Sequence, residues 1–241
     1  KFRDFTTNQY KFRTKNLNDI SIDPDWYFRE ENIWSTDPNN PSYLDGTYAV
    51  GNFQEVNQFD AQQLNIGGYL MTTFKFMSLL DVNIGVRAEK IDMYYTGANR
   101  AGQEFNDTNT LDELNILPSI NLTFRLSDDM NIRAAASQTV ARPSFKEKSG
   151  AEIYDPITKR TFIGNIDLEQ TLVQNYDLRW EWFITPRELI SVAGFYKRFD
   201  GHIELVSFPT APDNLSPRNS GIATLFGVEF EIRKALSAAE E

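Results

Sequence analysis

The segment "YDLRWEWF", from Tyr176 to Phe183, has side chains that alternate between two kinds. One register is aromatic or aliphatic and the other is fully charged: Tyr176, Leu178, Trp180 and Trp182 against Asp177, Arg179 and Glu181. A period of two residues predicts a β-strand, in which successive side chains point to opposite faces. The strand therefore has one apolar face and one charged face, and the fold depends on which of them is the inside.

The same alternation recurs along most of the chain. Apolar residues occupy nearly every second position in the segments 64–76, 80–95, 115–126, 131–141, 189–199 and 219–236. Together with the opening stretch they make seven predicted strands, each about twice the usual globular length of about 5 to 6 residues. The sequence thus predicts an all-β, antiparallel, up-and-down arrangement of long strands.

The connections between these strands alternate in length. Those near Ser78, at 127–130 and at 185–188 are short, whereas 97–114, 143–171 and 200–219 are long and rich in Gly, Pro, Asn and Asp. In an up-and-down sheet this order places all short turns at one end and all long loops at the other. Such asymmetry is typical of outer-membrane barrels.

The N-terminal residues 1–57 lack this period and are aromatic, acidic and rich in Pro and Asn. They are predicted to form a long extracellular excursion between strands, with a short helix around Trp26 to Trp34. Residues 58–241 are predicted to be part of a β-barrel domain.

Composition excludes several classes of function. The formal charge of −10 and pI near 4.7 argue against a nucleic-acid partner, since such proteins carry a basic face. There are no cysteines and only one histidine, His202, so thiolate sites, most catalytic triads and histidine metal clusters are ruled out. No catalytic residue, cofactor or metal is expected.

Two folds compete for this pattern. In a secreted or surface-attached β-sandwich that binds carbohydrate, the aromatic face of "YDLRWEWF" fills a core and the charged face meets water. In a transmembrane barrel, the aromatic face meets lipid and the charged face lines a polar lumen. Strands that cross a membrane need roughly 9 to 11 residues, so the strand lengths and the loop order favour the barrel.

The barrel interpretation assigns side chains to two surfaces. The residues expected to line the lumen are Arg87, Glu89, Arg125, Arg133, Asp177, Arg179, Glu181, Glu229, Glu231 and Arg233. Those expected to face lipid or to form an aromatic girdle at the membrane interfaces are Phe74, Phe76, Tyr94, Phe124, Tyr176, Trp180, Trp182, Phe226 and Phe230.

Four parts of the chain resemble consecutive barrel segments of TonB-dependent outer-membrane receptors, in the style of the Bacteroidetes branch. They are "GYLMTTFKF" with "LDVNIGVRAEK" (68–90), "INLTFRLSDDMNIRAAASQTVARPSF" (120–145), "GNIDLEQTLVQNYDLRWEWFI" (164–184) and "NSGIATLFGVEFEIRKAL" (219–236). The resemblance implies a fragment of a barrel of about 22 strands in the bacterial outer membrane, filled by a plug domain that this chain lacks. It also implies active uptake of a scarce or large nutrient such as a siderophore, glycan or vitamin, powered by the energy-coupling protein TonB. A nonspecific diffusion barrel is the third candidate, which the resemblance disfavours.

Two features of the N-terminal excursion suggest ligands. Trp26 and Trp34 lie among acidic and Asn-rich residues, where exposed aromatic rings either stack on a ligand or pack their own loop. The oxygen-rich "DPNNPSYLDG" (37–46) resembles a calcium loop, but it lacks the spacing of one and is interpreted as a Pro/Asn turn.

Overall fold

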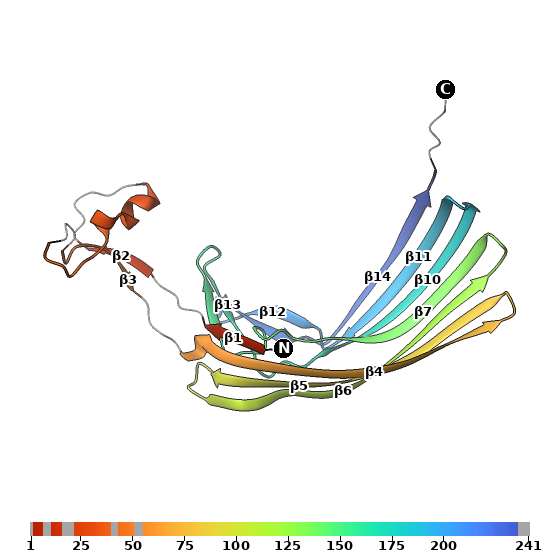
Figure 1. The fold of residues 1–241 in the computed structure, drawn as a ribbon, viewed down its shortest axis with the longest axis horizontal. Coiled ribbons are helices and arrows are strands. Elements are labelled where there is room, and N and C mark those ends of the chain that lie inside the picture. The colour runs from red at the N-terminus through yellow and green to blue at the C-terminus, as the bar shows by residue number, and fades with distance from the viewer. Residues whose placement is uncertain (1, 7–10, 16–21, 40–42, 51–54, 236–241) are drawn as a thin grey trace, which may run out of the picture.

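The computed structural model describes residues 2–6, 11–15, 22–39, 43–50 and 55–235. Most of them belong to a curved, single-layered sheet of eight antiparallel strands (Figure 1). Its order is β1 (Phe2–Thr6), β4 (Gln58–Phe76), β5 (Leu80–Ala98), β6 (Glu104–Arg125), β7 (Met130–Ala141), β10 (Thr171–Thr185), β11 (Glu188–Asp200) and β14 (Ile222–Arg233). The seven long strands that alternation predicts are all present, and β1 adds a short strand that pairs with the start of β4.

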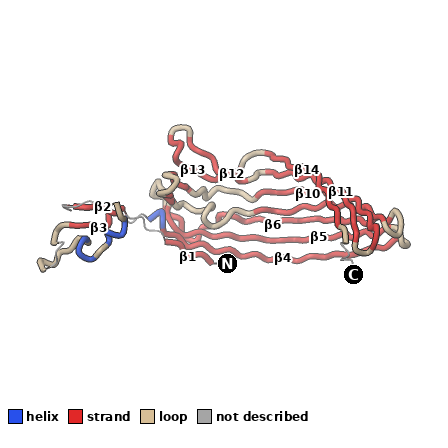
Figure 2. The backbone as a smooth tube through the Cα atoms, turned by 90° about the horizontal axis from the view of Figure 1, so that it is seen from above, coloured by secondary structure: helices blue, strands red, loops and turns tan. Residues whose placement is uncertain are grey.

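The three short turns lie together at one end of the long strands (Figures 1 and 2). Residues 77–79 join β4 to β5, 126–129 join β6 to β7, and 186–187 join β10 to β11. Met77 takes a positive φ of 53° in the first of them. The three predicted short turns, and their position at one end of the sheet, are therefore confirmed.

The long connections are more regular than the sequence suggests. The prediction of a long loop at 97–114 is wrong, because β5 extends to Ala98 and β6 begins at Glu104, which leaves only residues 99–103 between the two strands. The other two connections carry hairpins: β8 (Glu152–Asp155) with β9 (Arg160–Ile163), and β12 (Ile203–Phe208) with β13 (Ala211–Asn219). A parallel pairing of β13 with β9 joins these hairpins into one four-stranded sheet. Prediction missed these strands because they are short and their apolar residues do not alternate.

The N-terminal excursion contains a third, two-stranded sheet. Its strands are β2 (Lys11–Lys15) and β3 (Gly46–Val50), with the 3-10 helices η1 (Pro24–Phe28) and η2 (Glu30–Asn32) between them. A further 3-10 turn, η3 (Glu55–Asn57), leads into β4. The short helix expected around Trp26 to Trp34 is present as η1 and η2. We call β2, η1, η2 and β3 the N-terminal appendage.

The buried core is small and lies at the loop end. Phe59, Ala61, Tyr95 and Ala151 form one cluster, and Ile91, Met93 and Leu111 form a second, with Phe145 packed against both. Over the rest of the large sheet, the apolar face carries no second layer: Leu178 is 58% exposed and Phe230 is 78% exposed. A sandwich would bury this face, so the structure does not support the β-sandwich alternative.

Within the described ranges, no helix has the length and apolar character needed to span a membrane.

Candidate functional site

The register of the large sheet places apolar and charged side chains on opposite faces toward the turn end. Paired residues form rows across the strands, and one row of the even-numbered face is Leu80, Phe124, Ile132, Trp180, Val192 and Phe230. The adjacent row on the opposite face is Asp81, Thr123, Arg133, Arg179, Ala193 and Glu229. Six strands thus present one apolar face and one largely polar face, on which Ala193 is the apolar member of the row.

The aromatic residues predicted for the lipid side lie on this apolar, even-numbered face. Phe74, Phe76, Tyr176, Phe226 and Phe230 are exposed, while Phe124, Trp180 and Trp182 are half-buried among their neighbours. Trp182 lies at the turn end, where its Nε1 donates a hydrogen bond to Asp129 Oδ2 over 3.2 Å. Tyr94 lies apart from the others, because Lys90 and Asp92 separate it from the apolar rows.

The charged residues on the opposite face form a network centred on Arg179. Its Nη2 lies 2.6 Å from Glu231 on β14, and its Nε lies 3.0 Å from Glu181, which lies on β10 like Arg179 itself. Glu181 also accepts a hydrogen bond from Arg133 Nε on β7 over 2.8 Å, and Arg233 lies 2.9 Å from Glu231. The network therefore links β7, β10 and β14.

Small residues on β11 make this network possible. The strand β11 lies between β10 and β14, and its side chains facing the network are Ser191 and Ala193. These short side chains leave room for Arg179 and Glu231 to meet above them. A larger residue at either position would separate the two charges.

Two further ion-pair groups flank this network. Toward the loops, Glu89 lies 2.5 Å from Arg87 and 2.6 Å from Arg142. Toward the turns, Arg125 pairs with Asp81 and also donates to the carbonyl oxygen of Ser78. Eight of the ten predicted lumen residues thus have ionic partners. In the described part of the chain, the remaining two, Asp177 and Glu229, have none.

Away from the loop end, this arrangement stabilises a polar surface that no second sheet of the described residues covers. Opposite charges on neighbouring strands pair laterally, and unpaired carboxylates remain available to water or to another polar protein surface. Among the residues that the structure describes, no group of three or more Asp, Glu or His is placed to hold a metal ion.

The segment between β7 and β10 folds back over the charged face at the loop end. We call residues 142–170 the strap. The Gly150 N–H donates to Tyr95 Oη on β5 over 3.0 Å, and Asn115 on β6 exchanges two side-chain hydrogen bonds with Gln170 over 2.6 and 3.1 Å. The strap therefore covers part of the charged face at the loop end of the sheet.

Lys148 holds the strap together. It is only 2% exposed, and its Nζ donates to the carbonyl oxygens of Ile166 and Leu168 over 2.6 and 2.5 Å. Burial lowers the pKa of Lys148 from 10.5 to about 8, against the opposing effect of Asp167 and Glu169. Sequence reasoning missed Lys148, because a single lysine in an irregular segment gives no periodic signal.

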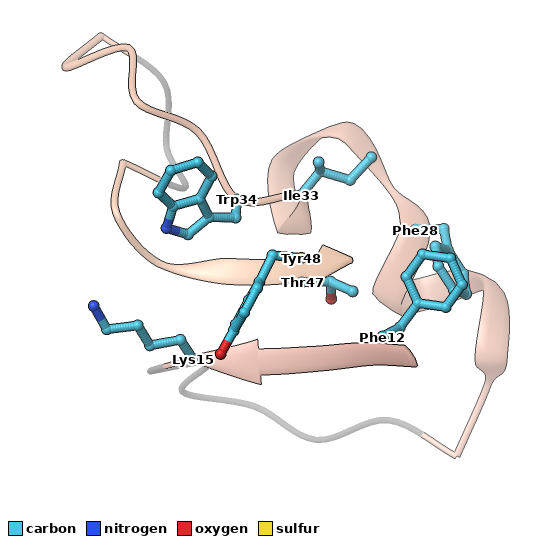
Figure 3. Close-up of a pocket in the computed structure, with 7 residues that line it drawn as sticks. All are labelled: Phe12, Lys15, Phe28, Ile33, Trp34, Thr47 and Tyr48. Carbon is cyan, nitrogen blue, oxygen red and sulfur yellow. The ribbon is translucent and has the colours of Figure 1, made fainter. Parts of the chain in front are cut away.

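The two tryptophans proposed to contact a ligand have different environments. Trp34 lines a cavity of about 610 Å³ in the N-terminal appendage (Figure 3). Trp26 does not line it, and instead packs edge-on against Tyr27 with ring centroids 5.1 Å apart. The oxygen-rich segment 37–46 begins with a side-chain turn, in which the Asn39 N–H donates to Asp37 Oδ1 over 2.9 Å.

Comparisons with known proteins agree with this geometry. A family model described as TonB dependent receptor-like, beta-barrel, matches residues 2–239. Two similar solved structures are the siderophore receptor PirA from Pseudomonas aeruginosa (16% identity, TM-score 0.50, 77% of this chain) and a hemophore receptor HasR double mutant from Serratia marcescens with its hemophore HasA and heme (12% identity, TM-score 0.58, 78% of this chain). This chain spans 41% of the first structure and 35% of the second, and at these identities the likeness shows the fold alone. No curated protein sequence matches the chain.

Proposed function

The chain belongs to the family of TonB-dependent receptor β-barrels, and from this we propose that it forms part of a receptor for active uptake of a scarce or large nutrient. The family consists of transport receptors of the bacterial outer membrane, and this chain is a β-barrel segment of that membrane. One of the similar structures is named a siderophore receptor and the other a hemophore receptor with heme. Their names support a scarce solute, with a siderophore, a glycan or a vitamin as candidates.

The observation that carries the proposal is the contrast between the two faces of one sheet. The apolar face has large side chains exposed, with Phe230 at 78%, while the opposite face is laterally paired by charge. Exposure of the apolar face to water is unfavourable in free energy, and exposure of the charged face to hydrocarbon is unfavourable as well. A barrel wall in a membrane satisfies both, with the apolar face toward lipid and the charged face toward the lumen.

The turns and loops give the wall a direction. Barrels of this type have short turns on the periplasmic side and long loops outside the cell. We place the turns at 77–79, 126–129 and 186–187 in the periplasm, and the strap, the four-stranded loop sheet and the N-terminal appendage outside. The ion pairs around Arg179 then lie in the lumen, where they meet the receptor's own plug domain.

The partners follow from this arrangement. The apolar face contacts outer-membrane lipid, the lumen face contacts the plug, and the energy-coupling protein TonB acts on the receptor from the periplasm. The extracellular solute meets the loop end first.

Depletion of solutes from the growth medium tests the function. Mass spectrometry of spent medium compares the parent strain, a strain without the receptor and a strain without TonB. We expect at least one large or scarce solute to remain in the medium in both deletion strains. Uptake that needs the receptor but not TonB would indicate a diffusion barrel, and identical media from all three strains would contradict a role in uptake.

A further inference from the structure

The N-terminal appendage contains two adjoining cavities that share a wall. The first, of about 610 Å³, is bounded by Trp34, Tyr48, Ile33 and Lys15, and the second, of about 640 Å³, lies beside Arg13 and Tyr27. Phe12, Phe28 and Thr47 line both. Figure 3 shows the first cavity with Lys15 and Trp34 on one side and Phe12 and Phe28 on the other.

The aromatic lining is not a packed core. Phe12 is 59% exposed and Phe28 is 48% exposed, although the two rings meet edge-on with centroids 4.9 Å apart. Trp34 is also exposed. Rings held in place with open faces offer stacking surfaces to a flat apolar ligand.

Thr47 supplies a polar group that lacks a partner. The residue is 4% exposed, yet its hydroxyl Oγ1 has no hydrogen-bond partner among the described residues. Buried hydroxyl groups are normally hydrogen-bonded, because an unpaired one costs free energy. Since Thr47 lines both cavities, a polar atom of a bound ligand is a suitable partner.

The charge of the cavities is opposite to that of the whole chain. The net charge is −10, but the described lining of the first cavity contains Lys15 and no carboxylate, and that of the second contains Arg13 and no carboxylate. The strand β2 that provides both cations reads "KFRTK". This local excess of positive charge favours an anionic ligand.

We propose that the N-terminal appendage binds a flat aromatic anion, such as an aryl carboxylate. The ring lies against Trp34 and the pair of phenylalanines, and its carboxylate accepts a hydrogen bond from the Thr47 hydroxyl. Lys15, on the other side of the cavity (Figure 3), attracts the negative charge of the ligand. This inference deepens the proposed function, because it names the class of solute that the outer side of the receptor captures, and it rests on that function. Ligand binding is measured separately from transport, so a failure of this binding proposal is distinguishable from a failure of the proposed uptake function.

Binding of 2-naphthoate to the intact receptor in lipid nanodiscs tests the proposal, with 2-naphthylmethanol as the uncharged analogue and empty nanodiscs as the blank. Isothermal titration is expected to show about tenfold tighter binding of the anion, as a charge-assisted hydrogen bond predicts. Lys15→Gln should abolish this preference, and Lys15→Arg should keep it. Thr47→Val should weaken naphthoate binding by about fivefold, as expected for one lost hydrogen bond, while Thr47→Ser retains it.

Matched controls separate binding from folding. Thr47→Val removes an unpaired hydroxyl at constant shape, so the thermal unfolding temperature should not fall. Trp34→Ala should weaken binding, whereas Trp26→Ala should not, because Trp26 lines neither cavity. Three results would overturn the proposal. They are equal affinity for the two naphthalene compounds, no effect of Lys15→Gln on the affinity for naphthoate, and no detectable binding of naphthoate at a concentration of about 1 mM, which corresponds to a binding free energy of about −4 kcal/mol. If a variant that no longer binds naphthoate still takes up the solute, the transported solute is not captured at this site. That result would not contradict the proposed transport function.

Discussion

At the scale of single residues, Arg179 shows what alternation does and does not reveal. Its place on the charged face follows from the pattern of "YDLRWEWF". Its partner Glu231 does not, because it lies 52 positions away and is reached across β11 above Ser191 and Ala193. Side-chain periodicity predicts a face, whereas an ion pair depends on the order of the strands and on the size of the residues between them.

Glu181 is the carboxylate most dependent on this network. It is 7% exposed, accepts a hydrogen bond from Arg133 and forms an ion pair with Arg179. Glu181→Gln removes the charge and one acceptor, so we expect a loss of about 1–3 kcal/mol in the free energy of unfolding. Urea unfolding of the receptor in lipid vesicles measures it. Glu229→Gln, on the same face but without an ionic partner among the described residues, should change stability by less than about 0.5 kcal/mol, and equal losses for both variants would contradict a structural role for the network.

Lys148 gives a prediction about pH. Its pKa is about 8 in the folded strap, against 10.5 for an exposed lysine. Between these two values the unfolded chain binds more protons than the folded one, so the stability of the strap should rise as pH increases from 8 to 10.5. Competitive acetylation of the intact protein with trace acetic anhydride, followed by mass spectrometry, reports the titration of Lys148. A midpoint near 8 supports the buried position, and a midpoint at the exposed value contradicts it.

At the scale of elements, the alternation of the sequence predicted the long strands and the short turns, but it placed a long loop at 97–114 where only residues 99–103 join β5 to β6. Seven alternating segments became β4, β5, β6, β7, β10, β11 and β14, and the short turns fell where a turn was predicted. The loop sheet was not predictable in the same way. Its joining contact pairs Asn214 with Thr161 and Leu215 with Phe162, and the two strands come from different connections of the chain. The cavity beside Trp34 likewise depends on how β2, η1 and β3 meet.

The two faces of β10 provide an element-scale test. Leu178 is 58% exposed on the apolar face, so an arginine there would be tolerated in water. In a barrel wall it would lie near the middle of the hydrocarbon, and Leu178→Arg should cost about 2–4 kcal/mol. The neighbouring Asp177→Arg, on the lumen face, should cost less than about 0.5 kcal/mol. Folding into vesicles, followed by urea titration, gives both values, and similar costs would contradict opposite environments for the two faces.

At the scale of the whole molecule, the large sheet has two open edges. Within the described residues, β14 pairs only with β11, and β4 beyond Gln62 pairs only with β5. Open edges present unpaired N–H and C=O groups, which recruit other strands. The curved sheet belongs to a chain that spans 41% and 35% of the two similar receptors, so most of each closed wall lies outside the part that matches.

These edges predict the behaviour of the 241-residue chain alone. Without detergent it should self-associate, because the edges and the exposed apolar face both favour contact between copies. Light scattering coupled to size-exclusion chromatography measures the mass with and without detergent. A stable monomer in plain buffer would be inconsistent with an apolar face that needs lipid.

In a barrel wall, neighbouring residues of one strand face lipid and a polar lumen in turn. The 241-residue chain has no native cysteine, so after replacement of any cysteine elsewhere in the intact receptor, single cysteines at Val228 and Glu229 can each carry a polarity-sensitive fluorophore. In vesicles, a brominated lipid should quench the label at 228 and spare the label at 229, while a water-soluble quencher should show the opposite order. Equal access of the aqueous quencher to both positions would contradict the barrel wall.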